Sequence, residues 1–214
     1  MNDNPPELSL LETRILGTLV EKQRTVPDTY PLSVNALQAG CNQKTSRNPV
    51  METTESEILV ALDDLKENGW VREVSGSRVS RFEHQVEKVL GVPTQASALL
   101  TVLMLRGPQT AGELRLNCER LYRFADISSV EAFLEELAAR ADGALVVELP
   151  RLPGARENRW MHLLGGQPQI ESGQASVRPV AANQDMEELR ARVTALEGEM
   201  AELRNLLRQV VDQS

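Results

Sequence analysis

The chain repeats one pattern of segments. The run Ala-Leu-Gln-Ala-Gly-Cys at 36–41 is echoed by Glu-Leu-Arg-Leu-Asn-Cys at 113–118, an offset of 77 residues. In both places an apolar stretch with helical spacing and an acidic pair follows, and then a short segment of β-like composition. Matching positions farther along, such as Leu65 and Leu137, are offset by a similar 72 residues. A period of this length is too long for a solenoid unit, so it indicates a duplicated small domain.

Length and composition agree with two small domains. A chain of 214 residues allows one or two domains, and the repeat selects two. Each copy spans roughly 75–85 residues, a size at which a hydrophobic core is thin. Only seven residues are aromatic (three Phe, two Trp and two Tyr), so the cores are expected to be aliphatic.

In the first repeat the sequence predicts three helices and a hairpin. The helices are expected at 9–22, 33–39 and 54–67, and the hairpin strands at 70–74 and 78–82. Ser9 with Glu12 and Thr54 with Glu57 have the spacing of capping boxes at the first and third helices. Gly40 is expected to end the second helix.

The second repeat predicts the same order. A helix at 95–105 stops at Gly107-Pro108, and a second helix follows the cap Thr110. The third helix is expected to open at Ser128 or Ser129 and to end near residues 141–143. Strands at 146–149 and 160–164 then complete a hairpin.

Three helices followed by a two-stranded wing is the winged-helix variant of the helix-turn-helix. The predicted fold class is therefore mainly α with small β hairpins (α+β), with two winged-helix domains at 1–92 and 93–166. Residues 167–184 are rich in Gly, Pro and small polar residues, which predicts a flexible linker. A C-terminal coiled-coil helix is expected over 185–214.

The coiled-coil prediction depends on an unbroken heptad seam in this tail. Apolar residues alternate at spacings of three and four over four heptads, which suits a narrow helix–helix seam and predicts a homodimer. A single amphipathic helix folding back on the body is the alternative. The predicted dimerisation residues are Met186, Leu189, Val193, Leu196, Met200, Leu203, Leu207 and Val210.

Catalytic and metal chemistry is not indicated. Cys41 and Cys118 occupy matching places, and we expect both to be small buried residues of the second helices. His84 and His162 are far apart and lack Cys or His companions at metal-binding spacing. The acidic pairs at 63–64 and 135–136 are expected on solvated helix faces. We therefore expect no enzymatic activity, metal or cofactor.

The chain has a formal charge of −8, and no region of it is strongly basic. Residues 1–92 carry 10 basic and 14 acidic side chains, and residues 93–166 carry 8 and 9. No apolar stretch approaches the ~18 residues of a membrane span. The N-terminus lacks the basic and apolar regions of a signal peptide, so a cytoplasmic location is expected.

The distribution of charge leaves nucleic-acid binding open. Both predicted third helices are acidic, which counts against base reading in the major groove. Basic residues collect instead at the wings and before the third helices, where they could contact phosphates or pair with acidic neighbours. These nucleic-acid-binding candidates are Lys44, Arg47, Arg78, Arg81, Arg115, Arg120, Arg123, Arg151, Arg156 and Arg159.

Three segments resemble the YceH family of bacterial proteins. They are 10–22 (Leu-Leu-Glu-Thr-Arg-Ile-Leu-Gly-Thr-Leu-Val-Glu-Lys), 41–50 (Cys-Asn-Gln-Lys-Thr-Ser-Arg-Asn-Pro-Val) and 106–115 (Arg-Gly-Pro-Gln-Thr-Ala-Gly-Glu-Leu-Arg); Thr29–Ser33 and the stretch from 115 to Phe124 also fit. The resemblance covers about residues 8 to 165. It implies a tandem winged-helix fold in a family without an established biochemical function, and it implies no functional residues.

Two functions of different classes follow. The first is a protein that binds double-stranded DNA through its wings and is associated with transcription. The second is a protein-interaction scaffold that uses acidic winged-helix surfaces and does not bind DNA, an expectation that rests on analogy of fold.

Overall fold

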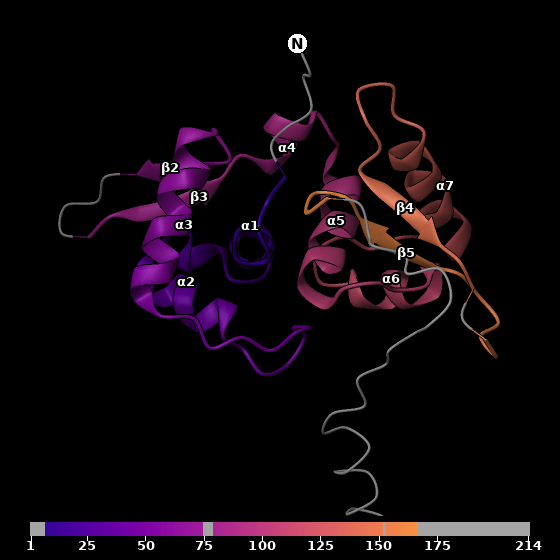
Figure 1. Cartoon of the computed structure of the whole chain (residues 1–214), viewed down its shortest axis with the longest axis horizontal. Helices are drawn as coiled ribbons and strands as arrows, with labels where there is room; N and C mark the ends of the chain where they lie inside the picture. The colour runs from indigo at the N-terminus through magenta and orange to yellow at the C-terminus, as the bar shows by residue number, and fades with distance from the viewer. Residues whose placement is uncertain (1–6, 75–78, 152, 167–214) are drawn as a thin grey trace, which may run out of the picture. The chain divides into compact units, whose positions relative to one another are not determined.

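A computed structural model describes residues 7–74, 79–151 and 153–166 of the chain (Figure 1). Helices and small antiparallel sheets alternate in this part of the molecule. The linker predicted for 167–184, the coiled-coil helix predicted for 185–214 with its dimerisation residues, and Arg78 lie outside the described residues. Those expectations stay predictions.

The first repeat contains the predicted helices and hairpin together with three short elements that the sequence analysis did not predict. Ser9 with Glu12 and Thr54 with Glu57 form the predicted capping boxes. The unpredicted elements are a 3-10 turn η1, a short strand β1 and a short helix α4. The elements are α1 (Leu10–Thr25), η1 (Pro27–Thr29), β1 (Leu32–Ser33), α2 (Val34–Cys41), α3 (Glu55–Glu67), β2 (Val71–Val74), β3 (Arg81–His84) and α4 (Val86–Leu90).

The second repeat follows the same order. Thr110 is the expected cap and forms a capping box with Glu113, and Gly107 ends the preceding helix with a φ of 76°. The elements are α5 (Thr94–Arg106), α6 (Ala111–Asn117), α7 (Ile127–Ala138), β4 (Val146–Leu149) and β5 (Arg159–His162).

Two helix boundaries differ from the prediction for physical reasons. Gly40 does not end α2 but lies inside it, where a Cβ atom would stand 2.6 Å from Thr18 Cγ2; it permits close contact with α1. Helix α7 opens earlier than Ser128 or Ser129, because Asp126 is the N-cap and its Oδ1 accepts from the Ser129 backbone N–H at 2.8 Å.

Smaller shifts occur at other ends. Helix α1 continues to Thr25 rather than stopping near Lys22, and α7 ends at Ala138 rather than near residues 141–143. Strand β5 lies one to two residues earlier than the predicted 160–164. Offsets of this size are usual where helix and strand ends fray.

In both repeats the hairpin also pairs with the segment that precedes the second helix. Strands β1, β3 and β2 lie in that order in one antiparallel sheet, with Leu32 opposite Phe82. In the second repeat β4 pairs with β5, and Gln109 makes an isolated bridge to Trp160. The matching pairings show that the sequence repeat is also a structural repeat.

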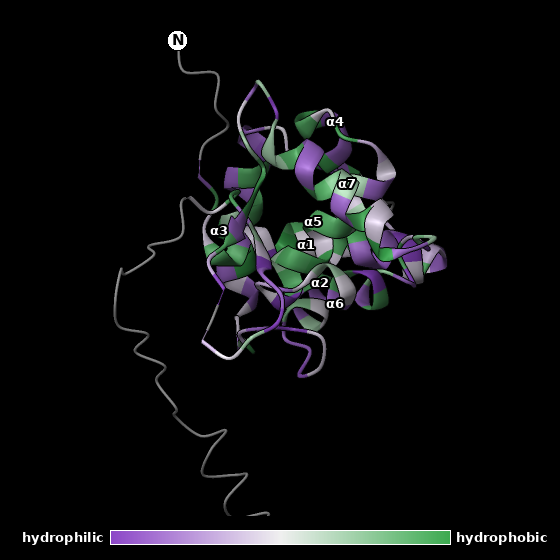
Figure 2. Ribbon diagram, turned by 90° about the vertical axis from the view of Figure 1, so that its right-hand side faces the viewer, coloured by the Kyte–Doolittle hydropathy of each residue, from purple (hydrophilic) through white to green (hydrophobic). Residues whose placement is uncertain are grey.

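The two repeats share a core along α1 and α5. These helices lie side by side and are rich in hydrophobic residues (Figures 1 and 2). Every residue from Ala96 to Leu105 on α5 is buried, because α1 covers one side of α5 and its own repeat covers the other. A Cβ atom on Gly17 would lie 2.9 Å from Leu105 Cγ, so glycine allows the two helices to approach.

Candidate interaction surfaces

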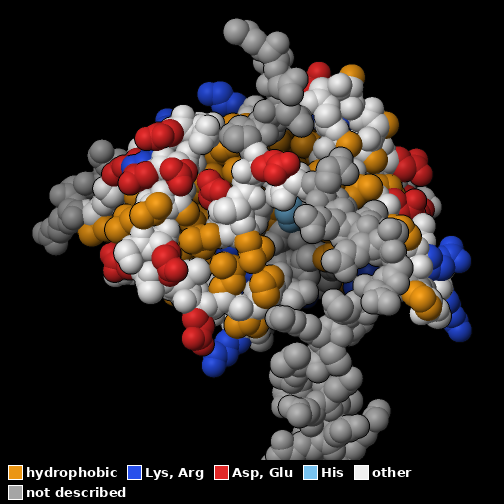
Figure 3. Space-filling view, viewed as in Figure 1, with side chains coloured by type: hydrophobic (Ala, Val, Ile, Leu, Met, Phe, Trp, Pro, Cys, Tyr) orange, Lys and Arg blue, Asp and Glu red, His pale blue; other side chains and the backbone are white. Residues whose placement is uncertain are grey.

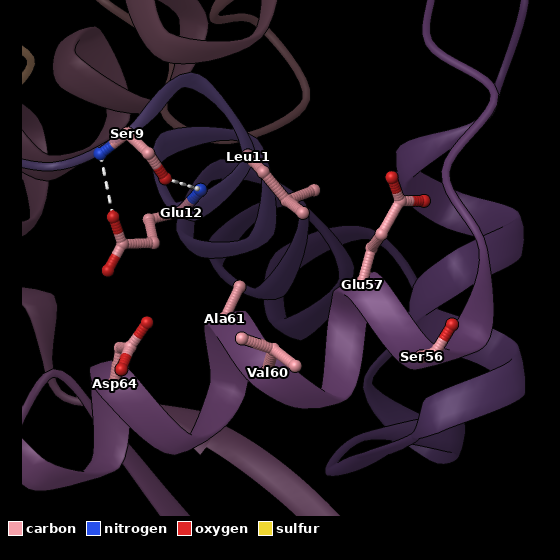
Figure 4. Close-up of a pocket in the computed structure, with 8 residues that line it drawn as sticks. All are labelled: Ser9, Leu11, Glu12, Ser56, Glu57, Val60, Ala61 and Asp64. Atoms are coloured by element: carbon pink, nitrogen blue, oxygen red, sulfur yellow. Dashed lines mark hydrogen bonds between the residues drawn. The ribbon is translucent and has the colours of Figure 1, made fainter.

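A shallow groove lies between the start of α1 and the exposed side of α3 (Figure 4). Its volume is about 420 Å³. Leu11, Val60 and Ala61 lie in its middle, with Glu12 and Asp64 on one side and Glu57 on the other. We call this the α1–α3 groove; Ser9 and Ser56 complete its lining.

Helix α3 exposes two large apolar side chains, and one of them, Val60, lines the groove. Ile58, Leu62 and Leu65 face inward, whereas Val60 is 64% exposed and Leu59 is 41% exposed. A surface helix of a globular protein usually keeps polar residues on its outer side. Figure 3 shows hydrophobic and acidic side chains intermixed on the face over α3. An apolar strip bordered by charge is typical of an interaction surface.

Two of the three carboxylates at the border of the groove are held in place by helix caps. Glu12 accepts from the Ser9 backbone N–H at 2.6 Å, and Glu57 accepts from the Thr54 backbone N–H at 2.7 Å. The bonds from the Thr54 backbone and hydroxyl lower the pKa of Glu57, so it is ionised at neutral pH. In the described part of the chain no ion pair engages Glu12, Glu57 or Asp64.

The third helix of the second repeat is also acidic. Glu131, Glu135 and Glu136 are exposed on α7, which contains no Lys or Arg. Arg140 follows the helix, but its guanidinium donates to the Leu90 carbonyl at 2.9 Å. The acidic outer faces predicted for both third helices are therefore present.

Arg47 was predicted to contact nucleic acid, but the structure gives it an internal role. Its side chain is fully buried and pairs with both carboxylate oxygens of Glu21, at 3.1 and 2.6 Å. Its Nε also donates to the Gly40 carbonyl at 3.1 Å. Because the guanidinium is enclosed by α1 and α2, it has no exposed face to offer a phosphate.

Burial and Arg47 have opposite effects on Glu21. Burial alone would raise the pKa of this carboxyl, whereas the hydrogen bonds and charge of Arg47, helped by Lys22, lower it below its ordinary value. The pair is therefore ionised at neutral pH.

Three other predicted arginines are bonded to the chain itself. Arg81 donates to the Pro31 carbonyl at 2.7 Å, and Arg159, at the matching position of the second repeat, donates to the Pro108 carbonyl at 3.1 Å. Arg159 also pairs with Glu113 at 3.2 Å. Arg115 donates to the Ala125 carbonyl at 3.0 Å. Arg81 and Arg159 thus tie each hairpin to the segment before the second helix, a role that their sequence context did not indicate.

The remaining candidates are exposed. Arg151 lies in the loop between β4 and β5 with Arg156 and donates to Asn158 Oδ1 at 3.3 Å. Arg123 lines a small hollow with Arg115, Leu116 and Phe124. These remaining candidates are Lys44, Arg120, Arg123, Arg151 and Arg156, and Arg81 and Arg159 are exposed as well.

Both cysteines are buried, as predicted. Cys41 and Cys118 are free thiols without solvent exposure. Burial raises the pKa of Cys41 to about 11 and that of Cys118 to about 12, so both are protonated and unreactive at neutral pH. Over the described ranges, no cluster of three or more His, Cys, Asp or Glu side chains could hold a metal ion, and no helix has the length and apolar character to cross a bilayer.

The comparisons with known proteins agree with the family resemblance. Residues 8–155 match the family model described as "Protein of unknown function, DUF480". A UPF0502 protein of Dechloromonas aromatica (strain RCB) is 81% identical over 207 residues, which is 97% of each chain. A UPF0502 protein of Burkholderia ambifaria (strain MC40-6) is 58% identical over 215 residues, covering 97% of this chain and 89% of the relative. The chain therefore belongs to the DUF480, or UPF0502, family of uncharacterised bacterial proteins.

Proposed function

We propose that the chain is a non-enzymatic tandem winged-helix protein that binds a basic, amphipathic segment of a partner protein in the α1–α3 groove. The order of three helices and a hairpin in each repeat supports the winged-helix part of this proposal. So does the pairing of each hairpin with the segment before the second helix, at Leu32 and at Gln109.

The observation that carries the binding proposal is the composition of the groove. Its apolar middle is formed by Leu11, Val60 and Ala61, of which Val60 is 64% exposed and Ala61 is buried, and the charged residues that line it are all acidic. An amphipathic helix can place apolar side chains in such a groove, and Lys or Arg on its flanks can then face Glu12, Glu57 and Asp64. From Glu57 to Asp64 the groove follows about 10 Å of α3, which matches about two turns of a partner helix.

The same charges disfavour base reading by α3. Phosphates repel exposed carboxylates, and the side chains that read bases in the major groove are mostly Arg, Lys, Asn and Gln. Helix α3 exposes Glu55, Glu57, Asp63 and Asp64, and its one basic residue, Lys66, is paired with Asp63 at 2.8 Å and with Glu73 at 3.1 Å. A basic protein segment fits this surface better than DNA.

A direct test uses a fluorescent synthetic peptide in which Leu and Lys repeat with helical spacing. Its anisotropy should rise with the full chain at low salt, with a Kd on the order of 10 μM. Val60→Arg should weaken binding by at least about tenfold. The larger side chain fills the groove, and its positive charge repels the Lys residues of the peptide. Binding that Val60→Arg leaves unchanged would show that the peptide binds by general acidity and would remove the groove from the proposal.

Matched controls separate the groove from surface charge. Val79→Arg introduces the same charge at a valine that is 57% exposed, beside the β2–β3 hairpin, and should leave affinity within about twofold. A peptide with Glu in place of Lys should not bind. If both peptides bind equally, charge complementarity plays no part.

DNA binding is a second candidate, supported by the exposed Lys44, Arg120, Arg123, Arg151 and Arg156. Exposed basic side chains on loops can contact phosphates without reading bases. Titration of labelled random duplex DNA should then show binding that weakens steeply between low and physiological salt, and Arg151→Ala with Arg156→Ala should reduce the salt slope. No binding at low salt would eliminate this candidate.

Dimerisation through the C-terminal heptads belongs to the same proposal. The seam from Met186 to Val210 would place two grooves on one assembly and raise avidity for a partner with two segments. Deletion of 185–214 should halve the mass measured by light scattering. An unchanged mass would contradict the coiled-coil prediction.

A further inference from the structure

A second cavity lies where the two repeats meet. It has a volume of about 250 Å³ and is lined by residues from the end of α1, the segment after α2, the end of α5 and the segment after α6. We call it the seam cleft. Because both repeats supply its walls, a molecule bound there would contact both of them.

The seam cleft is positively charged in a protein that is negative overall. Lys22, Arg106 and Arg120 line it, and the one carboxylate in the lining is Glu21. That carboxylate is already neutralised by the buried guanidinium of Arg47, which binds both of its oxygens. Excess positive charge in a concave site attracts anions.

The cations of the cleft have donors left for a ligand. Lys22 Nζ lies 3.3 Å from Glu21 and 3.4 Å from Gln43 Oε1, and Arg106 uses one nitrogen to donate to Ser46 Oγ at 2.7 Å. A guanidinium has five N–H donors, so most of those on Arg106 remain. Arg120 is exposed, and no hydrogen bond or ion pair engages it within the described segments.

The rest of the lining sets the chemical character of the ligand. Val26 and Leu121 contribute accessible apolar side chains, and Gln43, Thr45 and Asn117 contribute neutral polar groups. A volume of 250 Å³ lies just below the range of sites for drug-sized ligands, so the occupant is a small metabolite rather than a polymer. Arg and Lys are the usual partners of carboxylates and phosphates.

We infer that the seam cleft binds a small organic anion, whose carboxylate or phosphate oxygens face Lys22, Arg106 and Arg120 and whose carbon skeleton covers Val26 and Leu121. Such a ligand bridges α1 of the first repeat and α5 of the second. Binding therefore stabilises the packing of the two repeats against each other and raises the free energy of unfolding of the chain. This inference does not depend on the α1–α3 groove.

The test uses phenyl phosphate and citrate as probes with the full chain, by calorimetry and by thermal unfolding against sodium chloride of equal ionic strength. At least one probe should bind saturably and raise Tm by about 3 °C or more at a concentration about ten times its Kd. Phenyl phosphate should bind more tightly than inorganic phosphate if the apolar side chains contribute. No saturable binding of either probe overturns the inference.

Two arginines three residues apart provide a matched pair of variants. Arg120→Gln should weaken the bound probe by at least about tenfold, because Arg120 lines the cleft. Arg123→Gln removes the same charge from an exposed residue outside the cleft and should change Kd by less than about twofold. Equal effects of the two variants would mean that the probe senses only net charge, and the site would be rejected. Arg106→Gln, checked for its fold by circular dichroism, should also weaken binding.

Discussion

The segments that connect the second and third helices are held in place by different chemistry in the two repeats. In the first repeat, two buried arginines hold residues 42–54 in place: one lies on α1 and the other belongs to the segment itself. Arg14 is fully buried and donates to the carbonyls of Cys41 and Pro49, at 3.2 and 2.6 Å, and Arg47 reaches back from the segment to Glu21. The anchors of this segment are polar and lie inside the molecule.

In the second repeat, residues 118–126 are held by aromatic packing and by one hydrogen bond from Arg115 to the Ala125 carbonyl. Phe124 lies between Tyr122 and Phe133, with ring centroids 4.9 and 6.0 Å away. Arg120 and Arg123 of this segment are exposed. One topology therefore accommodates either a polar or an aromatic anchor for the segment between the second and third helices.

The largest expected effect concerns the polar anchor. Arg47→Met should lower the free energy of unfolding by about 3–5 kcal/mol, because it leaves the half-buried Glu21 carboxylate and the Gly40 carbonyl short of donors. Urea unfolding measures this change. Arg123→Met, at an exposed arginine of the second connecting segment, should cost less than about 0.5 kcal/mol. Similar losses in both variants would erase the proposed difference between the repeats.

A somewhat smaller effect concerns the aromatic anchor. Phe124→Ala should cost about 3 kcal/mol, since the ring is 4% exposed and packs against two others. The loss should not change with salt, whereas the loss in Arg47→Met should shrink when Glu21→Gln is added. Leu116→Ala, at a leucine 71% exposed, is the control and should be nearly neutral. A strong salt dependence in Phe124→Ala would contradict a purely apolar anchor.

A third comparison uses the histidines at matching strand ends. His84 ends β3 opposite Val71, and His162 ends β5 opposite Val146. Burial lowers the pKa of each imidazole to about 4, and nearby charges of both signs also act on His84. Both rings are therefore neutral in the folded chain at neutral pH.

The sign of the resulting pH dependence follows from these lowered values. A histidine with an ordinary pKa of about 6.5 in the unfolded chain takes up its proton there first, so stability present above pH 6.5 is lost as the pH falls through 4. Between pH 7 and pH 5, the free energy of unfolding should fall by about 2 kcal/mol per histidine. His162→Phe should reduce the difference between the free energies of unfolding measured with urea at pH 7 and at pH 5. His84→Phe should reduce this difference less cleanly, because it also removes the 2.8 Å bond to Gln23. An unchanged difference in His162→Phe would contradict a neutral buried ring.

Much of the fold could be predicted because the signals are local. The capping boxes at Ser9, Thr54 and Thr110 require only residues three apart, and all three are present. The prediction that Gly40 ends the second helix was wrong, because the role of this glycine depends on a contact with a distant part of the chain. A glycine after a helical run resembles a helix end, but here its missing side chain makes room for Thr18 of another helix.

The candidate sites were less predictable, because they depend on which residues meet in space. Exposed Val60 and the start of α1 are far apart in the sequence, yet they form one groove. Arg47 and Arg123 have the same residue type in comparable segments, and only packing places one inside and the other on the surface. Burial of a charge depends on a partner such as Glu21, 26 residues earlier in the chain.

Patterns in the chain predicted the duplication, the order of helices and hairpins, the acidic outer faces of both third helices and the burial of the two cysteines. These properties follow from spacing and side-chain type along short stretches of chain. Packing in three dimensions was needed to reveal that α1 and α5 join the repeats, that Arg47, Arg81 and Arg159 serve the fold, and that cationic side chains converge on the seam cleft. Hydrogen bonds, ion pairs and cavities depend on distances between side chains, which no local pattern specifies.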